Sequence, residues 1–156
     1  MKSILIVVGK TTDKHFIAGI ADYCSRINHY MPFELLVIPE LKNTKSLSES
    51  QQKEREGELI LKSLQPADTV VLLDERGEEW RSTAFASWLQ KKQQLTRRLV
   101  FVVGGPYGFS SAIYNRAQEK LSLSKMTFSH QMIRLIFTEQ LYRACTIIKG
   151  EPYHHE

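Results

Sequence analysis

The chain has 156 residues, enough for one well-filled hydrophobic core and too few for two ordinary domains, so we expect a single domain over residues 1–156. Hydrophobic residues make up 42% and charged residues 24%, as in water-soluble globular proteins. No apolar stretch approaches the roughly 20 residues of a membrane span, which excludes an integral membrane protein. The net charge of +4 favours a polyanionic partner without requiring one.

Short apolar runs alternate with segments of helical periodicity along the chain. The runs predict strands at 3–9, 33–40, 69–77 and 99–103, and a fifth at 121–128, where apolar and small polar residues alternate. Apolar residues at helical spacing predict helices at 13–30, 47–64, 83–95, 110–120 and 130–149. This order is typical of an α/β fold with a mainly parallel sheet and helices on both faces.

Several local features refine these elements. A polar loop at 41–48 leads into the second helix, and Ser46 and Glu49 have the spacing of a capping box there. Cys24 and Cys145 lie in apolar helical contexts without metal-ligand spacing, so we expect two core thiols and no metal site. The basic cluster "KKQQLTRR" at 91–98 is interpreted as a solvated helix end or, alternatively, a phosphate-binding patch.

The glycine-rich loop that follows the fourth strand raises a functional question. In "LVFVVGGPYGFS" (99–110), Gly104, Gly105 and Gly108 are able to adopt positive φ or to let another molecule approach the backbone, and Ser110 is placed to cap a helix. The loop is therefore either an ordinary tight turn or a cradle for a ligand.

The last helix, 130–149, has almost no wholly polar face. In a small domain one side of such a helix needs a cover outside its own sheet, and a second copy of the same helix across a two-fold axis is the simplest cover. The sequence thus predicts a homodimer. The alternative is a central helix buried within the monomer.

Several segments together resemble a known family. They are "LLD" (72–74), "VVGGPYG" (102–108), "LSLSKMTFSHQMIR" (121–134), "MPFE" (31–34), "EQLYRA" (139–144) and the terminal "YHHE" (153–156). On these the chain is similar, nearly end to end, to the ribosomal large subunit methyltransferase H family of small SPOUT-class methyltransferases. The resemblance implies an α/β fold whose C-terminal part forms a trefoil knot, an exception to the usual absence of knots.

The resemblance also implies an activity. The family acts as a homodimer, binds S-adenosylmethionine in the knot, and methylates N3 of a pseudouridine in a stem-loop of 23S large-subunit ribosomal RNA within the assembled ribosome. Its pattern places the cofactor against Leu73, Gly104, Leu123, Ser124, Lys125, Met126, Thr127 and Phe128. Without the resemblance, Leu73 would be interpreted as a core residue and Gly104 as a turn glycine. A cytoplasmic enzyme without metal is expected.

The acceptor N3 is an imide N–H that must lose its proton before it can attack a methyl group. The candidate bases are His130, Tyr153 and His154, and Arg134 shares a helix face with His130. His130 is alternatively a cap or interface residue, and Arg134 either binds a phosphate or carboxylate of a ligand or forms an internal salt bridge. His155 departs from the family, which has Arg or Lys after the Tyr-His pair.

Two rival functions remain open from the sequence. A doubly wound nucleotide-binding hydrolase or reductase would also have a glycine loop after a strand, but it predicts a GxGxxG turn after the first strand, where this chain has "VVGKTTDKHF". A catalytically silent RNA- or ribosome-binding factor of the same fold is the second rival. Cofactor binding distinguishes the first from a methyltransferase, and turnover distinguishes the second.

Overall fold

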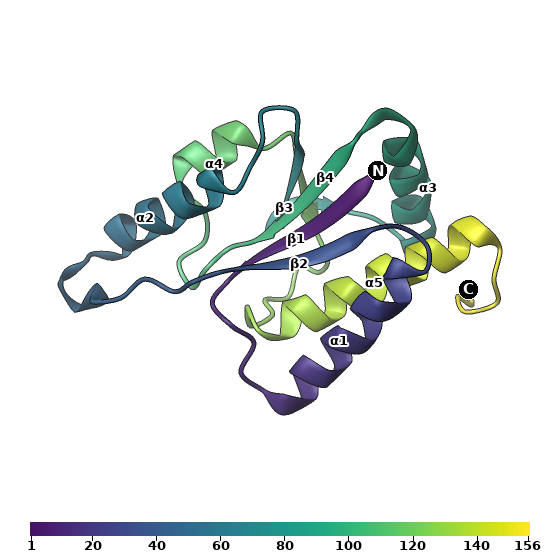
Figure 1. Cartoon of the computed structure of the whole chain (residues 1–156), viewed down its shortest axis with the longest axis horizontal. Coiled ribbons are helices and arrows are strands. Elements are labelled where there is room, and N and C mark those ends of the chain that lie inside the picture. Colours follow the sequence, from purple (N-terminus) through teal and green to yellow (C-terminus); the bar gives the residue numbers. More distant parts are fainter.

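The computed structural model describes all 156 residues and contains one five-stranded sheet with the order β2-β1-β4-β3-β5, in which every neighbouring pair is parallel (Figure 1). The strands are β1 (Lys2–Val8), β2 (Phe33–Ile38), β3 (Thr69–Glu79), β4 (Arg98–Val103) and β5 (Glu119–Ser122). The predicted parallel α/β architecture is therefore confirmed.

Helices cover both faces of this sheet. One face carries α1 (Lys14–Asn28), α3 (Ser82–Leu95) and α5 (Met132–Lys149), and the other carries α2 (Glu49–Lys62) and α4 (Ser111–Arg116) (Figure 1). A single 3₁₀ turn, η1 (Thr44–Ser46), precedes α2. Each parallel connection passes over a face of the sheet, as crossovers between parallel strands must.

The interior strand β1 divides its side chains between two hydrophobic cores. On β1, Leu5 and Val7 pack under α1, α3 and α5, whereas Ile4, Ile6 and Val8 pack under α2 and α4. These five side chains are at most 4% exposed. Because successive strand residues point to opposite faces, a strand covered on both sides must be apolar throughout, which explains the uninterrupted apolar runs in the sequence.

Helix α5 lies between α1 and α3 and has no exposed residue from Gln131 to Ile148. Helix α1 packs tightly on α5 at Gly19, where an added Cβ would lie 2.8 Å from Cδ1 of Leu135. Burial within the monomer, the alternative from the sequence, thus accounts for much of the apolar character of α5. Leu135 and Ile136 remain only partly buried, and the homodimer stays a prediction.

Most predicted elements end within two residues of the expected position, but two end at least four residues earlier. The helix expected over 110–120 ends at Arg116, because Gln118 already joins the sheet edge: its backbone N–H donates to Val70 O (2.9 Å) and its side chain accepts from Val70 N (2.7 Å). The strand expected over 121–128 is wrong beyond Ser122. There the Ser122 hydroxyl donates to Ser124 O (2.9 Å). This local bond replaces strand pairing for Ser124 O, and the chain turns away from the sheet.

The start of α2 also differs from the expectation. The capping box uses Ser48 and Gln51, with Ser48 N donating to Gln51 Oε1 (2.9 Å) and Gln51 N to Ser48 Oγ (3.1 Å). Ser46 belongs to the preceding 3₁₀ turn, so the predicted box of Ser46 and Glu49 was wrong by two residues. The expected core thiols are confirmed: Cys145 is buried and Cys24 is partly buried against the same core.

Candidate cofactor-binding site

A pocket of about 680 Å³ opens beyond the carboxyl ends of β3 and β4. Ligands of open parallel sheets bind at this edge, where the strand-end loops converge. Three segments build most of the pocket, with Lys53 of α2 and Tyr114 of α4 at its margin. They are residues 73–76 of β3, which begin where its pairing with β4 ends, the glycine loop over 103–109, and the segment 121–130.

Strand β3 is interrupted by an excursion at this edge. Both Leu73 and Glu78 lie opposite Leu121 of β5, so the four intervening residues 74–77 bulge out of the ladder. Asp74 anchors the bulge because its carboxylate accepts hydrogen bonds from Arg76 N (2.9 Å) and from the Tyr114 hydroxyl. Burial and the bond to Asp74 raise the pKa of Tyr114 to about 12, so this phenol stays a proton donor.

The glycine loop is both a tight turn and a wall of the pocket. Gly108 has φ +80°, a conformation that glycine adopts without steric penalty, and its N–H donates to Gly105 O (3.1 Å). A Cβ on Gly105 would lie 2.5 Å from a carboxylate oxygen of Glu56, and one on Gly104 would lie 3.3 Å from the Phe109 ring. The turn therefore lines the pocket with backbone that carries no side chains at its three glycines.

Glu56 supports this loop from α2. Its side chain is only 4% exposed, and Oε1 has no hydrogen-bond partner. Burial raises the pKa of this carboxyl, with Glu40 adding to the shift and Gln52 opposing it.

The segment 123–130 closes one side of the pocket without regular structure. Met126 N donates to Ser124 Oγ (2.9 Å), and the Thr127 hydroxyl donates to Glu75 of the β3 excursion (2.8 Å). Lys125 does not line the pocket; its ammonium lies 3.8 Å from the Glu79 carboxylate and its side chain is 87% exposed.

His130 and Arg134 have different environments, although they lie one turn apart. His130 lines the pocket and is half-buried. Arg134 is fully buried and faces the end of β1, where its guanidinium donates to Val8 O (2.9 Å) and Gly9 O (2.8 Å). Its Nε also donates to the His130 carbonyl (2.9 Å), and a further bond reaches the Thr11 hydroxyl (3.0 Å). Arg134 is thus placed to position the backbone of His130, and it neither lines the pocket nor forms an internal salt bridge.

The tail residues lie at the other end of α5. The Tyr153 hydroxyl donates to Glu139 (2.9 Å), and His154 Nδ1 lies 3.1 Å from Nη1 of Arg143. Burial and the bond to Glu139 raise the pKa of Tyr153, which makes its phenol a poor base. The 18 residues of α5 span about 27 Å, so His130 and the tail of one chain do not meet.

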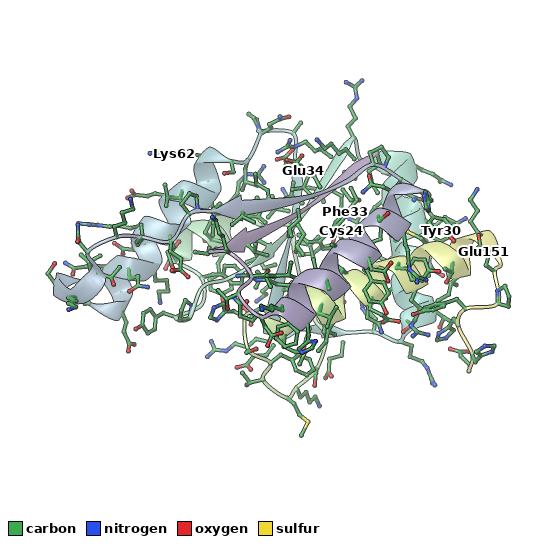
Figure 2. All side chains as sticks on the ribbon, turned by 60° about the horizontal axis from the view of Figure 1, so that its bottom comes forward. Cys24, Tyr30, Phe33, Glu34, Lys62 and Glu151 are labelled. Atoms are coloured by element: carbon green, nitrogen blue, oxygen red, sulfur yellow. The ribbon has the colours of Figure 1, made fainter.

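A separate contact fixes the start of the tail. Tyr30, which follows α1, donates a hydrogen bond of 2.6 Å to Glu151, and the two side chains lie together beside the end of α5 (Figure 2).

The structure brings together seven of the eight residues expected at the cofactor, all except Lys125. Among the site residues that the sequence did not single out are Asp74, Tyr114, Lys53 and Ile133. Asp74 directly follows the apolar run at 70–73, so the sequence did contain a signal for it, whereas nothing in the local sequence marks Tyr114. No cluster of three His, Cys, Asp or Glu side chains is arranged to hold a metal ion. None of the helices is long and apolar enough to cross a membrane.

Comparison with known proteins agrees with this arrangement. The family model described as "Predicted SPOUT methyltransferase" matches residues 1–154. Proteins named "Ribosomal RNA large subunit methyltransferase H" are similar over the whole of both chains, with 63% identity in Bacteroides fragilis and 64% in Phocaeicola vulgatus. A solved structure described as a probable methylase family protein from Haemophilus influenzae has a TM-score of 0.52 and 11% identity, covering 99% of this chain and 70% of that one, which supports the fold alone.

Proposed function

Because the chain belongs to the SPOUT methyltransferase family, we propose that it transfers a methyl group from S-adenosylmethionine to N3 of a pseudouridine in a stem-loop of 23S large-subunit ribosomal RNA, on the assembled ribosome. The observation that carries this proposal is the pocket at the ends of β3 and β4, whose lining includes the segments that resemble the family's cofactor site. The full-length relatives named as large-subunit RNA methyltransferases support the RNA substrate.

The residues of the pocket fit the cofactor chemically. Its volume, about 680 Å³, lies within the roughly 300–1,000 Å³ of small-molecule sites, and 10 of its 22 lining residues are hydrophobic, as a flat adenine requires. Leu73 and Phe128 offer apolar contacts, and Gly104 exposes backbone groups able to read the ring edge. The carboxylates of Asp74 and Glu75 supply negative charge for a cationic ligand.

When bound, S-adenosylmethionine supplies a methyl group already activated by its sulfonium, so the protein mainly has to align donor and acceptor. His130 is the pocket residue best suited to accept the N3 proton, because it lines the pocket and a neutral imidazole has a ring nitrogen with a free lone pair. Arg134 positions His130 through its carbonyl. Tyr153 and His154 lie at the other end of α5, and we propose that a second copy in a homodimer brings them to this site.

The test is transfer of labelled methyl from S-adenosylmethionine to intact ribosomes from cells that lack this enzyme, beside free ribosomal RNA and without added metal. We expect label at N3 of one pseudouridine in ribosomes and little on free RNA. Cofactor binding without label on ribosomes would contradict the proposal and favour a silent binder or another substrate.

A further inference from the structure

A second, smaller pocket lies beside the first. It measures about 340 Å³ and occupies the outer side of the β3 excursion, between that excursion, Trp80, the end of α4 and β5. Arg76 and Tyr114 line both pockets, so the two cavities share a wall. The volume is at the lower end of the roughly 300–1,000 Å³ of small-ligand sites, which suits one nucleotide.

The charged side chains that line this pocket differ in whether they have a partner within the protein. Both lining carboxylates are engaged: Glu78 accepts from Trp80 Nε1 (3.1 Å), and Glu119 accepts from Trp88 Nε1 (3.0 Å) and pairs with Lys92 (2.8 Å). The two lining cations, Arg76 and Lys120, are exposed, and no carboxylate lies within 4.0 Å of either. Lys92 offsets the charge of Glu119, whereas the indole bonded to Glu78 is neutral and leaves that carboxylate charged. The two cations therefore outnumber the one carboxylate without a cationic partner, and the net charge at the pocket is positive.

Aromatic rings accompany these cations. Trp80 packs on Trp88 with ring centroids 5.4 Å apart and is only partly buried. Lys120 holds its ammonium 5.6 Å from the centroid of the Tyr114 ring, and Tyr114 itself is 38% exposed. Partly exposed aromatic rings beside unpaired cations are the surface that unpaired nucleotides use, with the base on a ring and the phosphate on a cation.

We infer that this second pocket binds one unpaired nucleotide of the RNA substrate, adjacent to the nucleotide that is methylated. The inference rests on the RNA methyltransferase function proposed above, since the shared wall of Arg76 and Tyr114 places the second pocket next to the reacting centre. Lys120 and Arg76 hold phosphate, and Trp80 contacts the base. The pocket thus contributes to the selection of an unpaired RNA segment.

The direct test is binding of a labelled single-stranded hexauridylate to the full chain by fluorescence anisotropy. Lys120→Ala should weaken binding about fivefold and reduce the slope of log affinity against log salt by about one. Lys62→Ala is the matched control, because it removes one exposed lysine at the end of α2 (Figure 2) that does not line either pocket. Its affinity should equal that of wild type.

Trp80 also packs against Phe85 and Trp88 within the protein. A second pair of variants therefore distinguishes its stacking on a base from this internal packing. Trp80→Leu should weaken binding by about fivefold or more, whereas Trp80→Phe keeps a ring and should retain most of the affinity. With ribosomes as substrate, Lys120→Ala should raise KM with kcat and cofactor affinity unchanged.

The outcomes of these measurements are distinguishable. Equal hexauridylate affinity for Lys120→Ala and Lys62→Ala, or no binding by wild type, would overturn the nucleotide pocket. Normal hexauridylate binding and the expected variant effects, without methylation of ribosomes, would support the pocket and overturn the proposed acceptor instead.

Discussion

Replacement of Arg134 by methionine tests whether one buried guanidinium holds the His130 end of α5 against β1. The side chain is 0% exposed and donates to three carbonyls and one hydroxyl, those of Val8, Gly9, His130 and Thr11. Methionine fills much of the same volume but donates nothing, so these acceptors lose their partner inside the protein. At about 1–3 kcal/mol for each unsatisfied buried group, and with partial relaxation, we expect a loss of roughly 3–5 kcal/mol.

The assay is thermal and urea unfolding of Arg134→Met beside Arg55→Met, which removes an exposed arginine of α2. The buried variant should unfold about 6–20 °C below wild type, since 1 kcal/mol corresponds to roughly 2–4 °C at this chain length. Arg134→Lys should lose most of the same stability, because an ammonium lacks the planar fork that reaches several acceptors. An Arg134→Met stability within about 1 kcal/mol of wild type would refute the reasoning, because surface substitutions usually change stability by less than that.

Three further predictions concern the pocket. Burial raises the pKa of the Glu56 carboxyl, so the wild-type protein is most stable with this group protonated at low pH and loses that stability as pH rises through the folded-state pKa. Glu56→Gln should therefore be more stable than wild type near pH 8, and the difference should disappear below about pH 4.5. A pH-independent difference in urea unfolding would contradict it. Gly105→Ala should weaken S-adenosylmethionine binding measured by calorimetry, because its Cβ meets the Glu56 carboxylate. At Gly108 a Cβ has free space, so Gly108→Ala should only lower the stability of the protein by about 1 kcal/mol through backbone strain. Similar cofactor affinities for the two variants would argue against a closely fitted loop. His130→Ala should lower methyl transfer to ribosomes by about 10²-fold or more while cofactor affinity stays unchanged, and an undiminished rate would exclude it as the base.

Much of the fold follows from local patterns. The doubly covered strands at residues 3–9 and 99–103 were predictable because an uninterrupted apolar run is the direct signature of burial on both faces. The helix starts were less certain, since Ser46 and Ser48 both have a Glu or Gln three residues later. Ser48 is the cap because Ser46 lies in the 3₁₀ turn before α2, and the sequence does not show that turn.

The limits of the site prediction are also physical. The segment 121–128 alternates like a strand, but it leaves the sheet after Ser122, where the Ser122 hydroxyl donates to Ser124 O. The β3 excursion, which places both Leu73 and Glu78 opposite Leu121, also cannot be seen in a single segment. Arg134 has the spacing of a functional partner of His130, yet its guanidinium binds the end of β1, 125 residues away in sequence. Tyr114 enters the site only through the position of α4.

The central claim is that the pocket at the ends of β3 and β4 binds S-adenosylmethionine, and calorimetric titration of the cofactor into three proteins tests it most directly. Wild type should bind one cofactor per chain. Gly104→Val should lose binding because its side chain would press on the Phe109 ring and the Gly108 backbone, which both line the pocket, and so shift the glycine loop. Lys125→Ala should bind like wild type because that side chain is 87% exposed and does not line the pocket. Unfolding temperatures would verify that Gly104→Val remains folded. Equal affinity for wild type and a folded Gly104→Val would contradict the account.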